Sequence, residues 1–219
     1  MESIVRLHFY LGSSNKKQSA SASIIKYNNE LYVATAAHCI YDVLHQEKAR
    51  DIYIEVRNKK NIYIKVPVII LPKKWASTGN LSFDYAFGKI STTSLNKEDL
   101  EYFEPYFNFK ENINKKTEMY LGGYPISFLN TKQKISQGKL NLMFLKEEGL
   151  IGIQSNLKSG VSGGPCFLKK EDKYYQLGVA SFKIRKFKKT VWTTTWDNNA
   201  LRILENLHCS NKMEGYIFI

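Results

Sequence analysis

The sequence predicts an all-β protein made of two six-stranded antiparallel β-barrels, with a short helix near the C-terminal end. Short runs rich in β-branched and aromatic residues recur between turn-like clusters, and this rhythm is interrupted once, near the middle of the chain. With 219 residues and 43% apolar content, the chain can bury a substantial core. We therefore expect two β-rich halves rather than alternating strands and helices.

The first half, residues 1–95, is predicted to form one barrel. Residues 96–116 are expected to connect the two barrels, because the stretch from Ser91 to Lys116 loses the strand rhythm and carries Glu, Asp, Asn and Lys. The six candidate strands of the first barrel are Ser3–Tyr10, Ala22–Tyr27, Leu31–Thr35, Ile52–Val56, Ile62–Ile70 and Tyr85–Ile90.

The second half, residues 117–219, resumes the strand rhythm and ends in a predicted helix. Apolar residues fall close to helical spacing on one face of that helix, and either Asp197 or Asn198 can cap it. We expect this face to serve packing; its residues are Leu201, Ile203, Leu204 and Leu207. The candidate strands are Thr117–Leu121, Lys134–Leu145, Gly149–Gln154, Gly164–Leu168, Tyr174–Ser181 and Val191–Thr195.

The number of cysteines and the lengths of the apolar runs indicate the cellular compartment of the protein. Cys39, Cys166 and Cys209 are too few and too scattered for a disulfide framework, and an odd number leaves at least one free thiol. No run approaches the roughly 18 apolar residues that cross a bilayer, and Glu2 and Arg6 interrupt the first ten residues. We expect a cytoplasmic protein without a signal peptide or membrane span; export by a route not visible in sequence stays open.

The formal net charge of +12 suits nucleic acid, an anionic surface or an acidic protein partner. However, the lysines are spread along the chain and accompanied by many Asn and Ile residues, a bias that AT-rich coding alone produces. A solvated basic surface is the simpler interpretation. We therefore expect neither nucleic acid nor a membrane as a partner.

The segment Gly160–Pro165 places Ser162 among three glycines. Such a turn leaves a hydroxyl and nearby main-chain N–H groups exposed together, as a nucleophile with an oxyanion site requires. Alone, the segment is equally well explained as a β-turn. The sequence therefore offers Ser162 as a candidate nucleophile that needs partners.

Two further segments supply candidate partners. His38 follows an apolar strand and is flanked by small residues, and Asp84 directly precedes another apolar strand. A partly buried carboxylate there needs a donor such as an imidazole N–H. Each residue alone is usually structural, but the order His, Asp, Ser is one by which such a catalytic constellation is assembled.

With these motifs, Thr35–Cys39, Asp84–Ala86 and Gly160–Pro165, the sequence resembles the trypsin-like serine peptidases of the chymotrypsin fold. Gly122–Pro125, followed by Gln137-Gly138, is also similar to bacterial HtrA-like and glutamyl-endopeptidase-like members. The resemblance implies a site in the cleft between the barrels, and it extends from about Ser3 to Leu207.

For a serine endopeptidase, the resemblance implies that Ser162 attacks a peptide carbonyl, His38 takes and returns the proton, and Asp84 orients the imidazolium. The N–H groups of Gly160 and Ser162 are implied to form the oxyanion hole. The substrate is then a protein or peptide, and neither a cofactor nor a metal is expected.

The same resemblance implies substrate-binding residues. Ser181, Phe182 and Lys183 match a strand that pairs with substrate, and Ser181 is also expected to bond Asp84. Asn156 and Ser159 fall at the specificity pocket, where no Asp typical of trypsin is evident. Lys158 and Lys183 would instead favour an acidic substrate side chain by charge complementarity.

The chain also departs from that family. Digestive trypsins place Asp before the nucleophile, to pair with a new amino terminus, but here Val161 stands there, so we do not expect a trypsin-style zymogen. Cys39 lacks the upstream cysteine that usually bonds it, and whether it meets Cys166 is left open. Zinc binding by His38 and the cysteines is disfavoured, since no paired ligand spacing supports it.

Two functions remain in view. The first is a regulated endopeptidase of narrow specificity, controlled by a regulatory protein partner, an inhibitor or a disordered oxyanion loop. The second is a catalytically silent protease-fold module that binds an acidic partner or nucleic acid.

Overall fold

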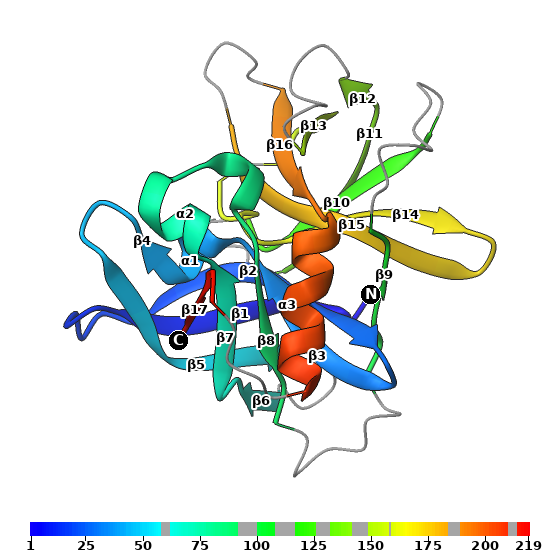
Figure 1. Ribbon diagram of the computed structural model, residues 1–219. Coiled ribbons are helices and arrows are strands. Elements are labelled where there is room, and N and C mark those ends of the chain that lie inside the picture. Colours follow the sequence, from blue (N-terminus) through cyan, green and yellow to red (C-terminus); the bar gives the residue numbers. More distant parts are fainter. Residues whose placement is uncertain are drawn as a thin grey trace.

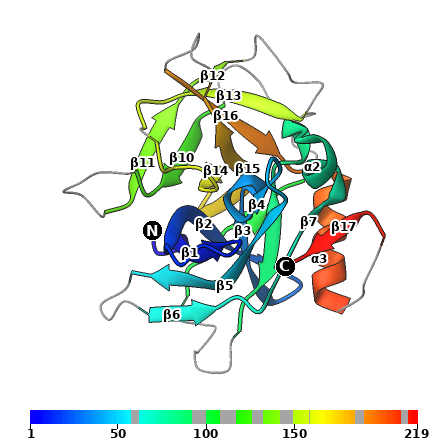
Figure 2. The same ribbon diagram turned by 90° about the vertical axis from the view of Figure 1, so that its left-hand side faces the viewer.

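Two curled β-sheets, each built mainly from one half of the chain, make up most of the structure, which is a computed structural model (Figure 1). The view turned by 90° shows the first sheet below the second (Figure 2). The structure describes residues 1–57, 62–91, 100–107, 117–125, 132–141, 149–157, 159–183, 189–209 and 214–219.

Nine strands of the described chain form the first sheet, in the order β17-β7-β8-β3-β2-β1-β5-β4, with β6 paired to β5. Asn28 and Asn29 join β2 to β3 with φ of 48° and 61°, the left-handed region that tight two-residue hairpin turns require. The strands are β1 (Ile4–Leu11), β2 (Gln18–Tyr27), β3 (Glu30–Thr35), β4 (Tyr41–Asp42), β5 (Glu47–Val56), β6 (Ile62–Lys65), β7 (Val68–Pro72), β8 (Ala86–Lys89) and β17 (Tyr216–Phe218).

Eight strands of the described chain form the second sheet, in the order β11-β10-β14-β15-β16-β13-β12. The eighth, β9, comes from the connecting stretch and pairs with β15 in parallel. The strands are β9 (Glu104–Pro105), β10 (Met119–Gly123), β11 (Lys134–Gly138), β12 (Leu140–Asn141), β13 (Leu150–Gln154), β14 (Pro165–Lys170), β15 (Lys173–Phe182) and β16 (Thr190–Thr195).

The helical elements are short except for the last one. They are α1 (Ala37–Ile40), α2 (Lys73–Thr78), the 3₁₀ turn η1 (Leu81–Phe83) and α3 (Asn198–Cys209). Of the two caps considered for α3, Asp197 is used: its Oδ1 accepts from the N–H groups of Asn199 at 3.0 Å and Ala200 at 3.2 Å. The apolar face of α3 joins the core of the first sheet, through Ala200, Ile203, Leu204 and Leu207.

The expected all-β architecture of two sheet units and a short C-terminal helix is confirmed. The strands outnumber the six expected for each barrel for two reasons. β4, β9 and β17 contain only two or three residues, too few to produce a recognisable run. The expected strands Ile62–Ile70 and Lys134–Leu145 each contain two strands of the structure, β6 with β7 and β11 with β12. The last strand, β17, joins the first sheet by pairing with β7, and α3 lies beside both strands (Figure 2). Part of the predicted 117–219 unit thus contacts the first half.

The described residues form two apolar cores, and the first and larger one also includes residues of the second sheet, such as Phe167 and Val179. Cys39 belongs to the first core and Cys166 to the second, while Cys209 is exposed, and all three thiols are free. No helix in the described part of the chain is long and apolar enough to cross a membrane.

The packing of α3 makes a stability prediction. Leu204 is fully buried, so Leu204→Ala should lower the free energy of unfolding by about 2–5 kcal/mol, as large-to-small core substitutions do. Glu205→Ala, on the exposed face of the same helix, should change it by less than about 0.5 kcal/mol. Urea unfolding measures both, and equal losses would contradict the packing described here.

Candidate active site

His38 lies on α1, directly after strand β3. The small residues Ala36 and Ala37 are fully buried, which lets the chain turn closely against the sheet, while the His38 side chain keeps 33% of its surface exposed. The ring of Trp75, from α2, has its centroid 6.5 Å from that of the imidazole. His38 is therefore placed at the edge of the first sheet with one side open.

Asp84 lies between η1 and β8 and has no exposed surface. Pairing of β8 with β3 sets Ala86 opposite Thr35, which brings Asp84 beside α1. The carboxylate accepts from the main-chain N–H of His38 through Oδ1 and from its Nδ1 through Oδ2, each at 2.8 Å. The hydroxyl of Ser181 also donates to Oδ2. The carboxylate thus fixes the imidazole ring from the Nδ1 side.

The two charges shift each other. Burial raises the pKa of the Asp84 carboxyl, but the charge of His38 and the hydrogen bonds from His38 and Ser181 outweigh burial, and the pKa lies below its usual value. Burial lowers the pKa of His38, whereas Cys39 and Asp84 raise it, and the net pKa lies well above 6.5. Such a pair favours an imidazolium beside a carboxylate.

The loop of residues 159–164, the nucleophile loop, carries the candidate nucleophile Ser162. It packs against residues near His38 and Asp84 in the chain or in the fold. Gly160 and Gly163 have φ of 98° and 80°, a left-handed region that favours glycine. A Cβ on Gly163 would lie 2.2 Å from the Thr35 Oγ1 atom, so the loop packs on the end of β3 just before His38. The N–H of Gly163 donates to the Ala180 carbonyl at 2.7 Å, next to Ser181.

The imidazole Nε2 lies 3.6 Å from Cys39 Sγ. Ser162 Oγ forms no hydrogen bond with His38 or with any other part of the described chain. Hydrogen bonds of catalytic groups are often long without substrate and tighten when it binds. The structure therefore joins His38 to Asp84 directly, and Ser162 lines the same pocket as Ser181, the other hydrogen-bond partner of Asp84.

Four of the six main-chain N–H groups in the loop, those of residues 159–162, donate to no acceptor in the described part of the chain. The N–H groups of Gly160 and Ser162 donate to no acceptor among the residues described, whereas those of Gly163 and Gly164 donate to Ala180 and Val161. Unused donors that flank a serine hydroxyl can stabilise a negative oxygen formed by attack of that hydroxyl.

A pocket of about 160 Å³ opens beside the loop. This volume suits one side chain rather than a complete drug-sized ligand, whose sites start at about 300 Å³. Four of the five expected substrate-binding residues line it, whereas Asn156 is exposed and does not, and Lys158 lies outside the described residues. The lining residues are Ser159, Gly160, Val161, Ser162, Ala180, Ser181, Phe182, Lys183 and Val191.

Two residues near this site had no functional expectation from sequence. Trp75 lies beside His38, and Ser21 of β2 bonds the nucleophile loop. The signal for Ser21 is weak: it stands in a run of Ser and Ala from Ser19 to Ser23, which indicates only that small side chains are needed there.

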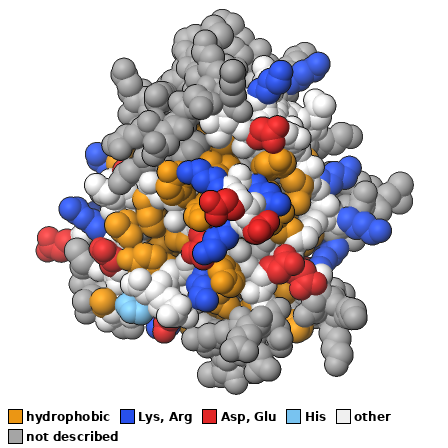
Figure 3. Space-filling model, turned by 90° about the vertical axis from the view of Figure 1, so that its right-hand side faces the viewer, with side chains coloured by type: hydrophobic (Ala, Val, Ile, Leu, Met, Phe, Trp, Pro, Cys, Tyr) orange, Lys and Arg blue, Asp and Glu red, His pale blue; other side chains and the backbone are white. Residues whose placement is uncertain are grey.

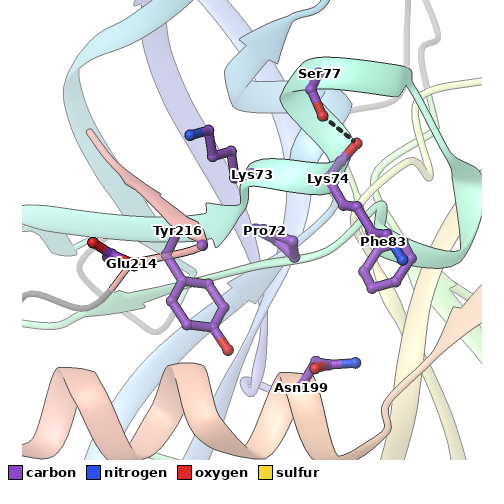
Figure 4. Close-up of a pocket in the computed structure, with 9 residues that line it drawn as sticks. Pro72, Lys73, Lys74, Ser77, Phe83, Asn199, Glu214 and Tyr216 are labelled. Atoms are coloured by element: carbon purple, nitrogen blue, oxygen red, sulfur yellow. Dashed lines mark hydrogen bonds between the residues drawn. The ribbon is translucent and has the colours of Figure 1, made fainter.

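A larger pocket of about 380 Å³ lies between α2, the start of α3 and β17 (Figure 4). In the close-up, Tyr216 and Phe83 flank the space, Asn199 lies below it and Lys74 extends across Phe83. None of its lining residues is His38, Asp84 or Ser162. The described ranges contain no cluster of three or more His, Cys, Asp or Glu side chains suited to a metal.

The chain is similar to known proteins at two levels, a family model and solved structures. The family model described as Trypsin matches residues 5–195. No curated protein sequence matches the chain significantly.

Several solved structures share the fold. The protease Anisep from Arthrobacter nicotinovorans is 22% identical in sequence to this chain. The match covers 96% of this chain and 95% of that chain, with a TM-score of 0.75. The thermostable serine protease AL20, from an extremophilic microorganism, is 20% identical (96% and 98% covered, TM-score 0.76). A Glu endopeptidase is 16% identical (95% and 91% covered, TM-score 0.73).

The environments of His8 and His38 shift their pKa values in opposite directions. Burial lowers the pKa of His8 despite its bond to Glu55, so His8 should titrate below 6.5 and His38 above it. Asp84→Asn should lower the pKa of His38, because it removes the facing charge. Ring-proton NMR titration measures both; an unshifted His38 in Asp84→Asn would contradict the pairing.

Proposed function

The chain belongs to the trypsin family of serine proteases, hydrolases that act on peptide bonds, and on this premise we propose that His38, Asp84 and Ser162 are its catalytic residues. The substrate is a protein or peptide. The observation that carries the proposal is the buried Asp84, bonded to His38 from one half of the molecule and to Ser181 from the other.

In the proposed reaction, Ser162 Oγ attacks the peptide carbonyl while its proton passes to His38 Nε2. The resulting imidazolium is stabilised by Asp84, and its proton then goes to the leaving amine as the C–N bond breaks. Water, deprotonated by His38, hydrolyses the acyl-enzyme ester and restores Ser162. Asp84 raises the pKa of His38 and so stabilises the imidazolium that holds the proton between steps, whereas the ring must be neutral when it accepts that proton.

The N–H groups of Gly160 and Ser162 are proposed to bind the carbonyl oxygen as it becomes negative. Each well-placed donor of this kind is worth about 3–4 kcal/mol of barrier. Phe182 stacks on Trp192, with ring centroids 6.2 Å apart, which holds the end of β15 firmly where substrate backbone is expected to pair.

The alternative, a silent module that binds nucleic acid or an acidic partner, rests on the net charge of +12. On the face shown in Figure 3, Lys and Arg side chains are interspersed with Asp and Glu among apolar side chains. Such a mixed face does not support nucleic-acid binding, which calls for a basic patch. We favour the endopeptidase.

The proposed peptidase is cytoplasmic and acts on few proteins, under the control of a regulatory partner or an inhibitor. The argument for control is chemical: an unrestrained peptidase in a compartment full of protein is hazardous. Full, unselective proteolysis by the isolated chain would argue against control and narrow specificity.

The nucleophile can be tested directly. A fluorophosphonate probe should label Ser162, because labelling needs an activated serine beside an oxyanion site. Ser162→Ala should abolish labelling and lower peptide hydrolysis by roughly 10⁴-fold or more. Peptide mapping by mass spectrometry identifies the labelled residue.

Ser14→Ala, on an exposed turn, is the matched control and should label like the wild type. Wild-type chain that is folded yet neither labels nor cleaves any member of a peptide library would refute the proposal. Salt-sensitive binding of RNA or DNA in that case would establish the alternative.

We further propose that the pocket prefers an acidic side chain. Lys183 Nζ donates to the carbonyl of Leu157 at the pocket, and burial lowers the pKa of this lysine. None of the lining residues is a carboxylate, and neither residues 149–170 nor residues 173–196 contain an Asp or Glu. An incoming carboxylate therefore meets a cation that, among the described residues, pairs only with a neutral acceptor.

The preference can be measured with isosteric peptides that carry Glu or Gln before the scissile bond. Wild type should have a higher kcat/KM for Glu, and Lys183→Met should reduce the Glu-to-Gln ratio by roughly tenfold, a modest figure because Lys183 is exposed overall. Lys189→Met, an exposed neighbour that does not line the pocket, should leave the ratio unchanged. A wild-type preference for basic or large apolar residues would refute this assignment.

A further inference from the structure

Ser21 on β2 connects the first sheet to the nucleophile loop. It has no exposed surface. Its N–H donates to the Ser162 carbonyl at 3.0 Å, and its hydroxyl donates to the Gly160 carbonyl at 2.8 Å. The same hydroxyl accepts from the N–H of Tyr124 at 2.8 Å, and the Ser21 carbonyl accepts from Thr35 Oγ1 at 2.9 Å. Every polar group of Ser21 is therefore engaged.

These bonds hold two carbonyls of the loop, those of Gly160 and Ser162, on either side of Val161. Because a peptide unit is planar, holding these two carbonyls also fixes the N–H groups of Val161 and Gly163. The adjacent peptide units carry the N–H groups of Gly160 and Ser162, which have no acceptor among the described residues. The bonds of Ser21 thus restrain the units next to both donors, and the bond from Gly164 N–H to the Val161 carbonyl holds the unit that carries the Ser162 N–H.

The loop needs such a restraint. Gly160 has no side chain to limit its backbone, and its φ of 98° is only one of several conformations open to glycine. Val161 anchors the loop by packing in the second core. However, an apolar contact is not directional, so it does not fix the orientation of a peptide unit. No charged side chain lies within residues 159–164.

We propose that Ser21 is a positioning residue that keeps the oxyanion site formed, a role that rests on the proposed peptidase function. The hydroxyl is the critical group, since it serves as donor to Gly160 and acceptor from Tyr124 at once. Ser21→Ala removes both bonds and leaves the Gly160 carbonyl free to turn, whereas the main-chain bond to Ser162 survives.

The test compares Ser21→Ala with Ser23→Ala in the full chain. Ser23 is two residues along the same strand and equally buried, but its hydroxyl bonds only weakly to Ala34, at 3.5 Å, and not to the loop. Ser21→Ala should lower kcat roughly ten- to hundredfold with KM changed less than about twofold, the pattern of a lost transition-state contact. Ser23→Ala should keep wild-type kcat.

Two further readouts separate positioning from general destabilisation. The rate of fluorophosphonate labelling should fall in parallel with kcat in Ser21→Ala, while the NMR pKa of His38 stays at its wild-type value, because Ser21 does not contact the His38–Asp84 pair. Ser21→Cys, which keeps a small side chain with weaker hydrogen bonding, should show an intermediate kcat, and it decides the question if Ser21→Ala does not fold.

The proposal is overturned if Ser21→Ala, or Ser21→Cys in its place, retains kcat within about twofold. It is also overturned if Ser23→Ala loses as much kcat, or if the pKa of His38 shifts together with the loss. These outcomes all require an active wild type. An inactive wild type instead rejects the peptidase function itself, so the two failures are distinguishable.

Discussion

Asp84 is a carboxylate with no exposed surface, and burying such a charge is costly unless hydrogen bonds and an opposite charge compensate it. The first half of the molecule supplies two donors, both from His38, and the second half supplies the Ser181 hydroxyl. The Thr194 hydroxyl, also from the second half, bonds the carbonyl of Leu81 in the turn that leads to Asp84, at 2.8 Å. The carboxylate therefore depends on correct docking of the two sheets, and the orientation of His38 depends on the carboxylate.

The same docking positions the nucleophile loop. Ala180, the neighbour of Ser181, bonds the loop through its carbonyl to Gly163 and through its N–H to Gly164. Ser21 holds the other side of the loop from the first sheet. The loop is thus held between strands of both halves by hydrogen bonds of main-chain and hydroxyl groups. It contains no charged residue that could form an ion pair, and its residue Val161 is apolar.

Sequence was sufficient for features with a local pattern. The apolar strand before His38, the acid before the strand at Ala86 and the glycines around Ser162 are each visible in a few residues, and the Ser181–Asp84 bond followed from family resemblance. Features that depend on distant pairing were not predictable. The pairing of β17 with β7, the parallel pairing of β9 with β15, and the contacts of Ser21 join residues far apart in the chain, and nothing in their local sequence identifies the partner. Asn156 was expected at the pocket but does not line it. The position of a residue along a loop cannot be derived from sequence without the fold.

The central claim is that Ser162 becomes acylated with the help of His38. Mass spectrometry of the intact chain, quenched during turnover of an activated p-nitrophenyl ester, measures this intermediate. The account predicts one acyl group per chain, located on Ser162 by peptide mapping and absent from His38→Ala. Acylation of another residue, such as Cys39, or undiminished acylation of Ser162 in His38→Ala, would contradict it.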